Sequence, residues 1–445
     1  MSKWKQLEKK YINSSMMRRN ILSLLLLFGS CIFAFGQAVL TLQEAITLAK
    51  KANDGLEISR MTAALDQMQV YKGNAGMTPR VDWNVNLGSS FNNVNQSFFD
   101  GRNINRFGRS VAPNTNVALS WTLFDGSRGK TRYSILQAQS DKSLLSVKDT
   151  EDLLEYQVSV AYYSMAKQKD AISYLQTIIK YYEERVKITQ ERWQIGRGSK
   201  LDYLQSQNDL NAQIAAIQTA QIILDNQKVV FNLLLGREAD DLFDTEAVVP
   251  KLDETAKDGL LKMALENDEA LKLIDKDLII NDLRVKELQG ARLPTIALNT
   301  AFGYSLSNTN AGLILLNQNL GLSVGVTSTW NIYDGHQNRR QTDIASFRSD
   351  IIARQKEATI SNIKSEISVA VNQLGAAKRL LEVEETNKTI AEENLQISLE
   401  KFRLGGSTIL DLNEAQQRYD AALNRYVDAY YDVRFAELEI ERISK

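Results

Sequence analysis

The side chains that most often carry acid–base, nucleophilic or metal chemistry are almost missing from this sequence. His336 is the only histidine and Cys31 the only cysteine among 445 residues. A histidine-based triad or a metal site with several histidine or cysteine ligands is therefore not available within one chain. The aspartates and glutamates lie mostly at exposed positions of helical patterns, where a solvated carboxylate is the default. We expect no enzyme activity, no metal site and no cofactor.

Two short motifs each occur twice. The first is Trp121-Thr-Leu-Phe-Asp-Gly126, which recurs as Trp330-Asn-Ile-Tyr-Asp-Gly335. The second is Arg192-Trp-Gln-Ile-Gly196 with Leu201-Asp202 beyond it, which recurs as Lys401-Phe-Arg-Leu-Gly405 with Leu410-Asp411. Both pairs are about 209 positions apart, so roughly 80 residues keep register without a gap. The sequence therefore predicts a tandem duplication, with repeats at 37–236 and 255–445 and a linker at 237–254.

The hydrophobic period changes in the same order in both repeats. Helical patterns at 41–77 and 255–293 end before Pro79 and Pro294, and a period of two follows each proline. One face of this alternation is apolar, and the other carries small and amide residues with almost no charge. The pattern predicts four strands of about ten residues, the length that a tilted membrane strand needs, at 81–90, 115–124, 295–304 and 321–332.

A half-buried sheet of a soluble protein shows the same alternation. Long polar loops expected at 92–113 and 305–319, and Trp83, Trp121 and Trp330 near strand ends, favour membrane strands. Four strands cannot close a barrel, and an open edge cannot face lipid. We therefore expect the chain to assemble with copies of itself, as a dimer with eight strands or a trimer with twelve.

Very long helical patterns follow each Asp-Gly, one running to Trp193 and the other to Phe402. Each spans about 68 residues, or roughly 100 Å of continuous helix, and must pack laterally as a coiled coil. Heptad seams with small or polar residues at alternate steps mark the return helices: Ala415, Tyr419, Ala422, Tyr426, Ala429, Val433, Ala436 and Ile440 in one, and Ser206, Leu210, Gln213, Ile217, Ala220, Leu224, Gln227 and Phe231 in the other. An antiparallel hairpin in a soluble bundle explains these heptads equally well.

The N-terminus reads as an export signal at 1–36. Arg18 and Arg19 precede an apolar run at 21–35, and we expect cleavage after Gly36. Two alternatives remain, a retained membrane anchor and a lipoprotein signal cleaved before Cys31, and Met16 or Met17 is an alternative start. The formal net charge of −1 gives no basic footprint for nucleic acid.

The sequence resembles the TolC family of outer-membrane efflux channels. The resemblance rests on the order of its features: export signal, tandem repeat, strand pair, long helix, glycine turn and return helix. The resemblance covers essentially the whole mature chain, and the two glycine-turn motifs are its most specific part. It implies an α+β membrane protein that forms a homotrimer, whose twelve strands make one barrel in outer-membrane lipid and whose helices continue as an α-helical barrel across the periplasm. It also implies a passive exit duct of a tripartite efflux or type I secretion system, served by a periplasmic adaptor and an inner-membrane pump.

The resemblance also implies roles for residues of the two turns. The turns at Gly196, Gly198, Gly405 and Gly406 would dock the adaptor, and Asp202, Asp411 and Glu414 would form an acidic periplasmic gate. For the two aspartates, capping of the return helix is the alternative role. Ser407 stands where the family often has an arginine, so the closing contacts must come from elsewhere, such as Arg197 or Arg403.

A periplasmic coiled-coil adaptor or scaffold is the alternative function, because such a protein is also exported and rich in helical hairpins. It would not need four amphipathic strands or a duplication that repeats them. Within the channel interpretation, no residue indicates the cargo or the class of pump.

Overall fold

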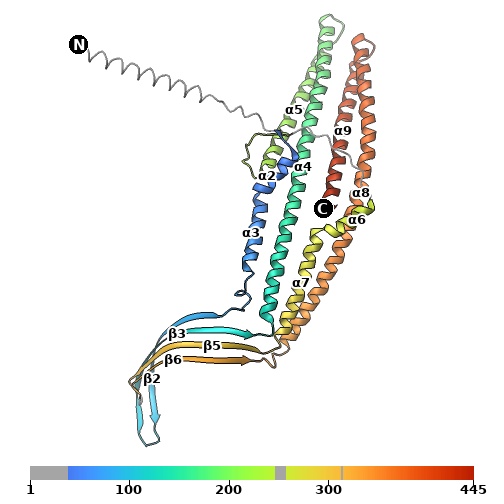
Figure 1. Ribbon diagram of the computed structural model, residues 1–445. Helices are drawn as coiled ribbons and strands as arrows, with labels where there is room; N and C mark the ends of the chain where they lie inside the picture. The colour runs from blue at the N-terminus through green and yellow to red at the C-terminus, as the bar shows by residue number, and fades with distance from the viewer. Residues whose placement is uncertain (1–38, 246–256, 312–313, 445) are drawn as a thin grey trace, which may run out of the picture.

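The computed structural model describes residues 39–245, 257–311 and 314–444. The expected export signal, with Cys31, lies outside these residues, as does 246–254 of the expected linker. Figure 1 shows an elongated molecule with a curved sheet at one end and two long helical hairpins at the other. Its elements are β1 (Val39–Leu40), α2 (Leu42–Ala52), α3 (Asp54–Gln69), β2 (Arg80–Ser97), β3 (Asn103–Phe124), α4 (Arg128–Gln194), α5 (Lys200–Leu234), β4 (Asp244–Thr245), α6 (Lys257–Asn267), α7 (Glu269–Gly290), β5 (Thr295–Thr309), β6 (Leu316–Thr329), α8 (Gln337–Leu404) and α9 (Ile409–Ser444).

The large sheet contains both strand pairs in the order β2-β3-β5-β6, with every neighbour antiparallel. The β3–β5 pairing joins the first repeat to the second, and β2 and β6 are the two edges. Cross-strand partners share a face, and this register puts the large apolar residues on one side. That apolar face is exposed and includes Val81, Trp83, Val85, Leu87, Val117, Phe302, Leu322, Val324 and Val326.

The opposite face of the sheet is lined by small and amide side chains. Asn84 Nδ2 donates to Asn116 Oδ1 at 3.0 Å, and Asn86 Nδ2 donates to Asn114 Oδ1 at 3.2 Å. Asn299 Nδ2 donates to Thr327 Oγ1 at 3.1 Å across the second pair. The amides therefore bond to one another and to a hydroxyl across neighbouring strands, and Arg80 and Asp82 form an ion pair at one end of this face.

The expected loops at 92–113 and 305–319 are wrong in extent. The β2–β3 ladder continues from Arg80↔Ser120 to Ser97↔Asn103, and β5 pairs with β6 as far as Asn308↔Leu316. Polar residues continue the ladder here because the backbone hydrogen bonds, and not an apolar face, extend the hairpin. The strands are consequently longer than the ten residues expected, and residues 98–102 alone connect β2 to β3.

Each strand-to-helix corner is built from the repeated Asp-Gly. Gly126 and Ser127 both adopt left-handed backbone conformations, with φ of 72° and 66°, and Gly335 and His336 do the same. The carboxylate before each pair caps the new helix, because Asp125 Oδ2 accepts from Gly129 N at 2.7 Å and Asp334 Oδ2 accepts from Asn338 N at 2.8 Å. A Cβ on Gly126 would lie 2.2 Å from Gly290 O, so this corner also needs glycine for close approach.

The tryptophans of the repeated motif each donate a hydrogen bond to the segment that leads from a helix into the sheet. Trp121 Nε1 donates to Met77 O at 3.2 Å, and Trp330 Nε1 donates to Arg292 O at 3.0 Å. Each acceptor lies two residues before a proline and beyond the end of the preceding helix. The helices α3 and α7 end at Gln69 and Gly290, earlier than the helical patterns at 41–77 and 255–293 predicted. Trp83 differs, because its Nε1 donates to Thr115 Oγ1 on the neighbouring strand at 2.8 Å.

The helices form a layer near the sheet and two hairpins beyond it. In the layer, α3, α4, α7 and α8 lie side by side in that order, and α4 and α8 continue into the hairpins α4–α5 and α8–α9. The predicted seam of α9 lies in the core, since Ala415, Tyr419, Ala429 and Val433 are buried. Among the described residues no helix combines the length and apolar character needed to cross a membrane.

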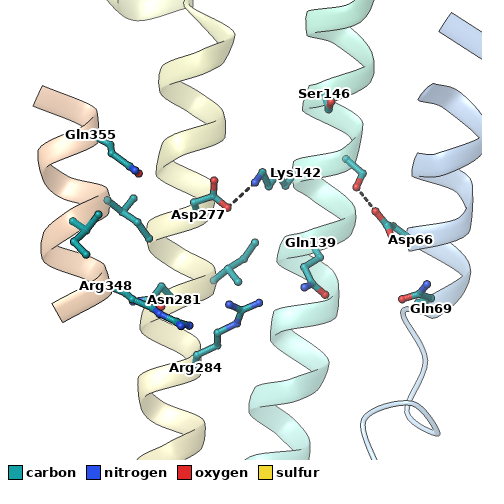
Figure 2. Close-up of a pocket in the computed structure, with 14 residues that line it drawn as sticks. Asp66, Gln69, Gln139, Lys142, Ser146, Asp277, Asn281, Arg284, Arg348 and Gln355 are labelled. Carbon is teal, nitrogen blue, oxygen red and sulfur yellow. Dashed lines mark hydrogen bonds and ion pairs between the residues drawn. The ribbon is translucent and has the colours of Figure 1, made fainter. Parts of the chain in front are cut away.

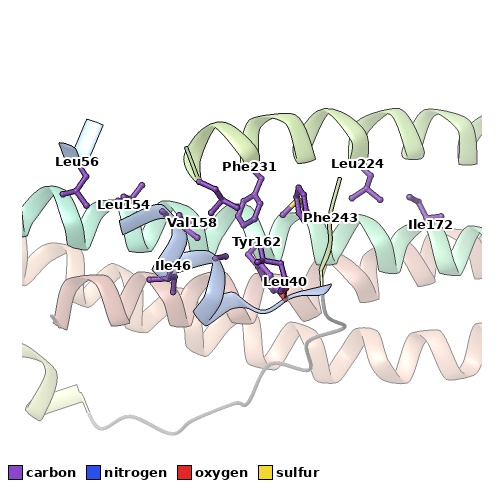
Figure 3. Close-up of a cluster of buried hydrophobic side chains, with 14 of the residues drawn as sticks. Leu40, Ile46, Leu56, Leu154, Val158, Tyr162, Ile172, Leu224, Phe231 and Phe243 are labelled. Atoms are coloured by element: carbon purple, nitrogen blue, oxygen red, sulfur yellow. Dashed lines mark hydrogen bonds between the residues drawn. The ribbon is translucent and has the colours of Figure 1, made fainter. Parts of the chain in front are cut away.

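A small lateral domain, formed by β1, α2, β4 and the end of α5, packs on the middle of α4. Leu154, Val158 and Tyr162 of α4 contact residues of α2, α5 and β1, with Phe231 and Phe243 between them (Figure 3). Tyr162 Oη donates to Leu40 O at 2.9 Å. β1 pairs in parallel with β4, so the expected linker contributes a strand at Asp244–Thr245.

Candidate gate and docking tips of the helical hairpins

Both hairpin tips reverse the chain through the same glycine geometry. The φ of Gly196 is 74° and that of Gly405 is 84°. Both values fall in the left-handed region, which only glycine enters without strain. Arg197 N donates to Arg192 O and Gly406 N donates to Lys401 O, each at 2.8 Å. These bonds close the last turn of α4 and of α8. Gly198 and Gly406 do not adopt positive φ, so only one glycine per tip is required by backbone conformation.

The two return helices begin differently. Ser199 is the N-cap of α5, and its side chain accepts from Leu201 N at 3.0 Å. At the second tip Thr408 Oγ1 accepts from Asp411 N at 3.3 Å, while Asp411 Oδ2 accepts from Thr408 N at 2.9 Å and from its hydroxyl at 2.8 Å. Asp411 therefore stabilises the helix start as the reciprocal partner of the cap residue, and not as the cap itself.

The three carboxylates carried over from the family have different surroundings. Hydrogen bonds from the Thr408 backbone and hydroxyl hold the pKa of Asp411 below its usual value of 3.8. Glu414 is exposed, and its Oε1 lies 2.5 Å from Arg418 Nη2 on the next turn of α9. Asp202 lies in the first turn of α5, and its carboxylate has no hydrogen bond or ion pair within the described part of the chain.

Two arginines join the hairpin ends to each other. Arg192 of α4 donates to Phe402 O of α8, and its guanidinium lies 4.2 Å from the centre of the Phe402 ring. Arg403 of α8 pairs with Glu184 of α4 and with Glu400 on its own helix at 3.1 Å. Of the two arginines named as alternatives for the closing contacts of the gate, Arg403 joins the two hairpins within this chain. Among the residues described, Arg197 has no ion pair, and the Ser407 hydroxyl is buried with no hydrogen-bond partner.

A buried arginine that the sequence reasoning missed lies deeper between the hairpins. Arg185 of α4 is 1% exposed. Its Nη1 donates to Asn413 Oδ1 at 3.1 Å and to Gln416 Oε1 at 2.7 Å on α9, and its Nη2 pairs with Asp209 on α5. One guanidinium thus connects three helices. The available signal was a difference between repeats, because the position equivalent to Arg185 in α8 is Asn394.

A groove opens between the tips. Its cavity of about 680 Å³ is lined by the ends of α4 and α8, including Ile188, Ile195 and Leu404 among apolar residues and Glu184, Glu191 and Arg197 among charged ones. Apolar surface with charges of both signs at its rim is typical of a surface that binds another protein segment. Of the four glycines expected to dock the adaptor, Gly405 lines the groove.

Sequence comparison identifies the family. The family described as "Outer membrane efflux protein" matches residues 45–237 and 260–444. The chain is 23% identical over 409 residues to outer membrane efflux protein BepC of Brucella suis biovar 1, which covers 89% of this chain and 84% of that protein. It is 22% identical over 368 residues to outer membrane protein TolC of Escherichia coli, covering 80% of this chain and 73% of the relative.

Solved structures share the fold. The outer-membrane channel CmeC of Campylobacter jejuni superposes with a TM-score of 0.74 at 15% identity, over 91% of this chain and 85% of CmeC. The outer membrane protein VceC of Vibrio cholerae gives a TM-score of 0.71 at 14% identity, over 91% and 96% of the two chains. With the family matching both repeats and the fold shared with outer-membrane channels, the chain belongs to the outer membrane efflux protein family, the TolC-type channels of the outer membrane.

Proposed function

We propose that three copies of this chain form a passive exit duct of a tripartite efflux or type I secretion system, with the sheets closed as one barrel in the outer membrane and the helices in the periplasm. A periplasmic adaptor and an inner-membrane pump would complete the system. The sheet carries this proposal, because it combines an apolar face with two unpaired edges.

The apolar face has the height of a membrane band. On β2 it runs from Val81 to Phe91, about 33 Å along the strand and roughly 23 Å at a tilt of about 45°, close to the ~25 Å band of outer-membrane barrels. It ends where Phe91 and Phe107 stack with ring centres 6.4 Å apart. Beyond them the same side of the hairpin carries Asn93, Asn95 and Ser97. The polar end of the hairpin therefore suits the outer surface, and the amide face suits a water-filled lumen.

The outer helices of the layer support assembly with further copies. α3 exposes Ile58, Met61, Leu65 and Met68 at spacings of three and four, and α8 exposes Ile344, Phe347 and Ile351. These stripes lie at opposite edges of the layer, next to the β2 and β6 edges of the sheet. Joining the α3 edge of one copy to the α8 edge of the next is a head-to-tail contact, which closes as a ring. Three copies give twelve strands.

The hairpin tips supply the proposed adaptor contact and the proposed gate. The groove between the tips, which Ile195, Arg197 and Gly405 line, suits docking of an adaptor segment. Asp202, Asp411 and Glu414, repeated in three copies, would concentrate negative potential at a narrow opening and favour cations. The cap role of Asp411 is compatible with this gate, because both roles require an ionised carboxylate.

Extraction and electrophoresis test the assembly. We expect the chain to fractionate with the outer membrane, to require detergent for extraction, and to run as a trimer that heat converts to monomer. The Ile58→Asp, Met61→Asp double variant should lose the trimer band, whereas Arg60→Asp on the same helix should keep it. A water-soluble periplasmic product would contradict the channel and favour the adaptor or scaffold alternative.

Single-channel recording tests the gate. Alanine at Asp411 and Glu414 should raise the current through a single trimer in a planar bilayer and weaken block by multivalent cations. Because Asp411 also caps α9, the variant Asp411→Asn is the control: it removes the charge but keeps an acceptor oxygen for Thr408. Unchanged conductance and block in both variants would refute the acidic gate.

A further inference from the structure

A polar hollow lies on one face of the four-helix layer, away from the tips and the sheet. Its volume is about 670 Å³, and α3, α4, α7 and α8 all contribute to its wall. Figure 2 shows the labelled side chains of this hollow, with Lys142 of α4 reaching Asp277 of α7. Because four adjacent helices line a single hollow, it lies on the side toward which the layer curves.

Two guanidinium groups in the hollow have no carboxylate partner. Lys142 Nζ pairs with Asp277 Oδ1 at 2.7 Å, and Asp66 accepts a hydrogen bond from Ser143. Within the described residues, Arg284 and Arg348 make no ion pair and no hydrogen bond, although Arg348 extends from α8 toward α7 (Figure 2). Three cations therefore face two carboxylates, and both carboxylates are already engaged.

The hollow and the small lateral domain lie on different sides of α4. That domain packs on α4 at Leu154, Val158 and Tyr162, whereas the hollow uses Ser146 and residues before it. Val158 follows Ser146 by 12 positions, or about 3.3 turns of helix, so the two side chains leave α4 in directions roughly 120° apart. A lateral domain inside the duct would block it, so the hollow faces the lumen in the proposed assembly.

We propose that this hollow is a lumenal binding site for organic anions, with Arg284 and Arg348 holding a sulfonate, carboxylate or phosphate group. Planar guanidinium groups donate paired hydrogen bonds to anionic groups of this kind. Since Arg284 and Arg348 have no acceptor within the described residues, binding an anion would break no hydrogen bond of the protein. Ile280 and Ile352 of the same wall would contact an apolar body attached to the anion. The proposal rests on the proposed duct and names a class of ligand for its lumenal wall: amphipathic anions.

Calorimetry of the detergent-solubilised trimer with naphthalene-2-sulfonate tests the site. We expect one molecule bound per chain, and at least about tenfold weaker binding for Arg284→Gln and for Arg348→Gln, the loss of one charge-assisted hydrogen bond. Arg284→Lys should be intermediate, because it keeps the charge but loses the paired donors. Inorganic sulfate, which lacks an apolar body, should bind more weakly than naphthalene-2-sulfonate, and equal binding would overturn the proposed preference for amphipathic anions.

Lys142→Gln is the matched control, since it removes one positive charge from the same hollow at a residue already paired with Asp277. We expect its affinity to stay within about threefold of the original, and an equal loss in all three glutamine variants would mean a diffuse potential and overturn the site. In planar bilayers, naphthalene-2-sulfonate should reduce the current, and Arg284→Gln should relieve this block. A conducting trimer with arginine-independent binding would refute the site alone, whereas arginine-dependent binding without conductance would refute the duct.

Discussion

The two hairpin tips descend from one repeated motif, yet they are stabilised in different ways. The first tip begins its return helix with a serine cap and leaves Asp202 without a partner among the described residues, and its long helix carries the buried Arg185. The second tip uses the reciprocal cap of Thr408 and Asp411, and has the exposed Asn394 in place of Arg185. The backbone turn is thus common to both tips, whereas the polar contacts are divided between them. A duplicated unit can keep its geometry while each copy acquires a separate task.

The largest difference between the hairpins is the buried arginine, and replacing it should break their contact. Arg185→Met leaves Asp209 and Gln416 without their partner, and we expect the packing of α9 on α4 to lose about 3 kcal/mol. Amide hydrogen exchange should speed up by roughly a hundredfold in α9. The equivalent variant in the other repeat, Asn394→Met, should leave exchange unchanged within a few fold. Equal effects of the two substitutions would mean that the hairpins are held symmetrically.

The two strand-to-helix corners, at Gly126 and Gly335, can be compared in the same way, with a smaller expected loss of stability. Gly126→Ala places a Cβ against Gly290 O in addition to the left-handed strain, and we expect a cost of roughly 2 to 3 kcal/mol. A Cβ at Gly335 meets nothing within 4 Å. Gly335→Ala should therefore cost about 1 kcal/mol, the conformational strain alone. The temperature at which the proposed trimer dissociates in detergent measures both costs. If Gly335→Ala costs as much as Gly126→Ala, the close approach to Gly290 contributes nothing.

The smallest effect is the pH dependence of the second cap. The pKa of Asp411 is lower in the folded chain than its usual 3.8, so its stabilisation of α9 is complete at neutral pH and is lost as the pH falls below that value. Hydrogen exchange in 405–415, corrected for the intrinsic rate, should rise in that acidic range. Asp411→Asn should abolish the step. Asp202→Asn at the other tip should change nothing, and a step of similar size there would show that the caps are equivalent.

Much of the fold was predictable because its signals are local. The repeated Asp-Gly and glycine-turn motifs, the prolines and the change of hydrophobic period predicted the duplicated order of elements. The predicted ends of the β-strands were wrong, because backbone pairing in the β2–β3 hairpin continues through polar residues such as Asn93 that carry no strand signal. Long-range contacts were also out of reach: Trp121 with Met77, and Arg185 with Gln416, depend on packing between segments 44 and 231 positions apart.

For the candidate gate, the sequence suggested Asp202, Asp411 and Glu414 but did not predict their contacts within the chain. Asp411 was expected as a gate residue or as a cap, and its position three residues after Thr408 is the spacing of a reciprocal cap. Such a cap is readable from sequence once the N-cap residue is chosen correctly. The acidic gate itself stays a prediction, since it depends on how several copies meet at the tip.

The seam between β3 and β5 has a consequence for the origin of the molecule. It joins the second strand of one repeat to the first strand of the next, and the proposed contact of β6 with β2 of another copy would do the same. The β3–β5 contact within each chain would then resemble the β6–β2 contact between neighbouring chains. A ring of three chains would have nearly sixfold symmetry, and an ancestor with a single repeat would have needed six separate subunits to build it.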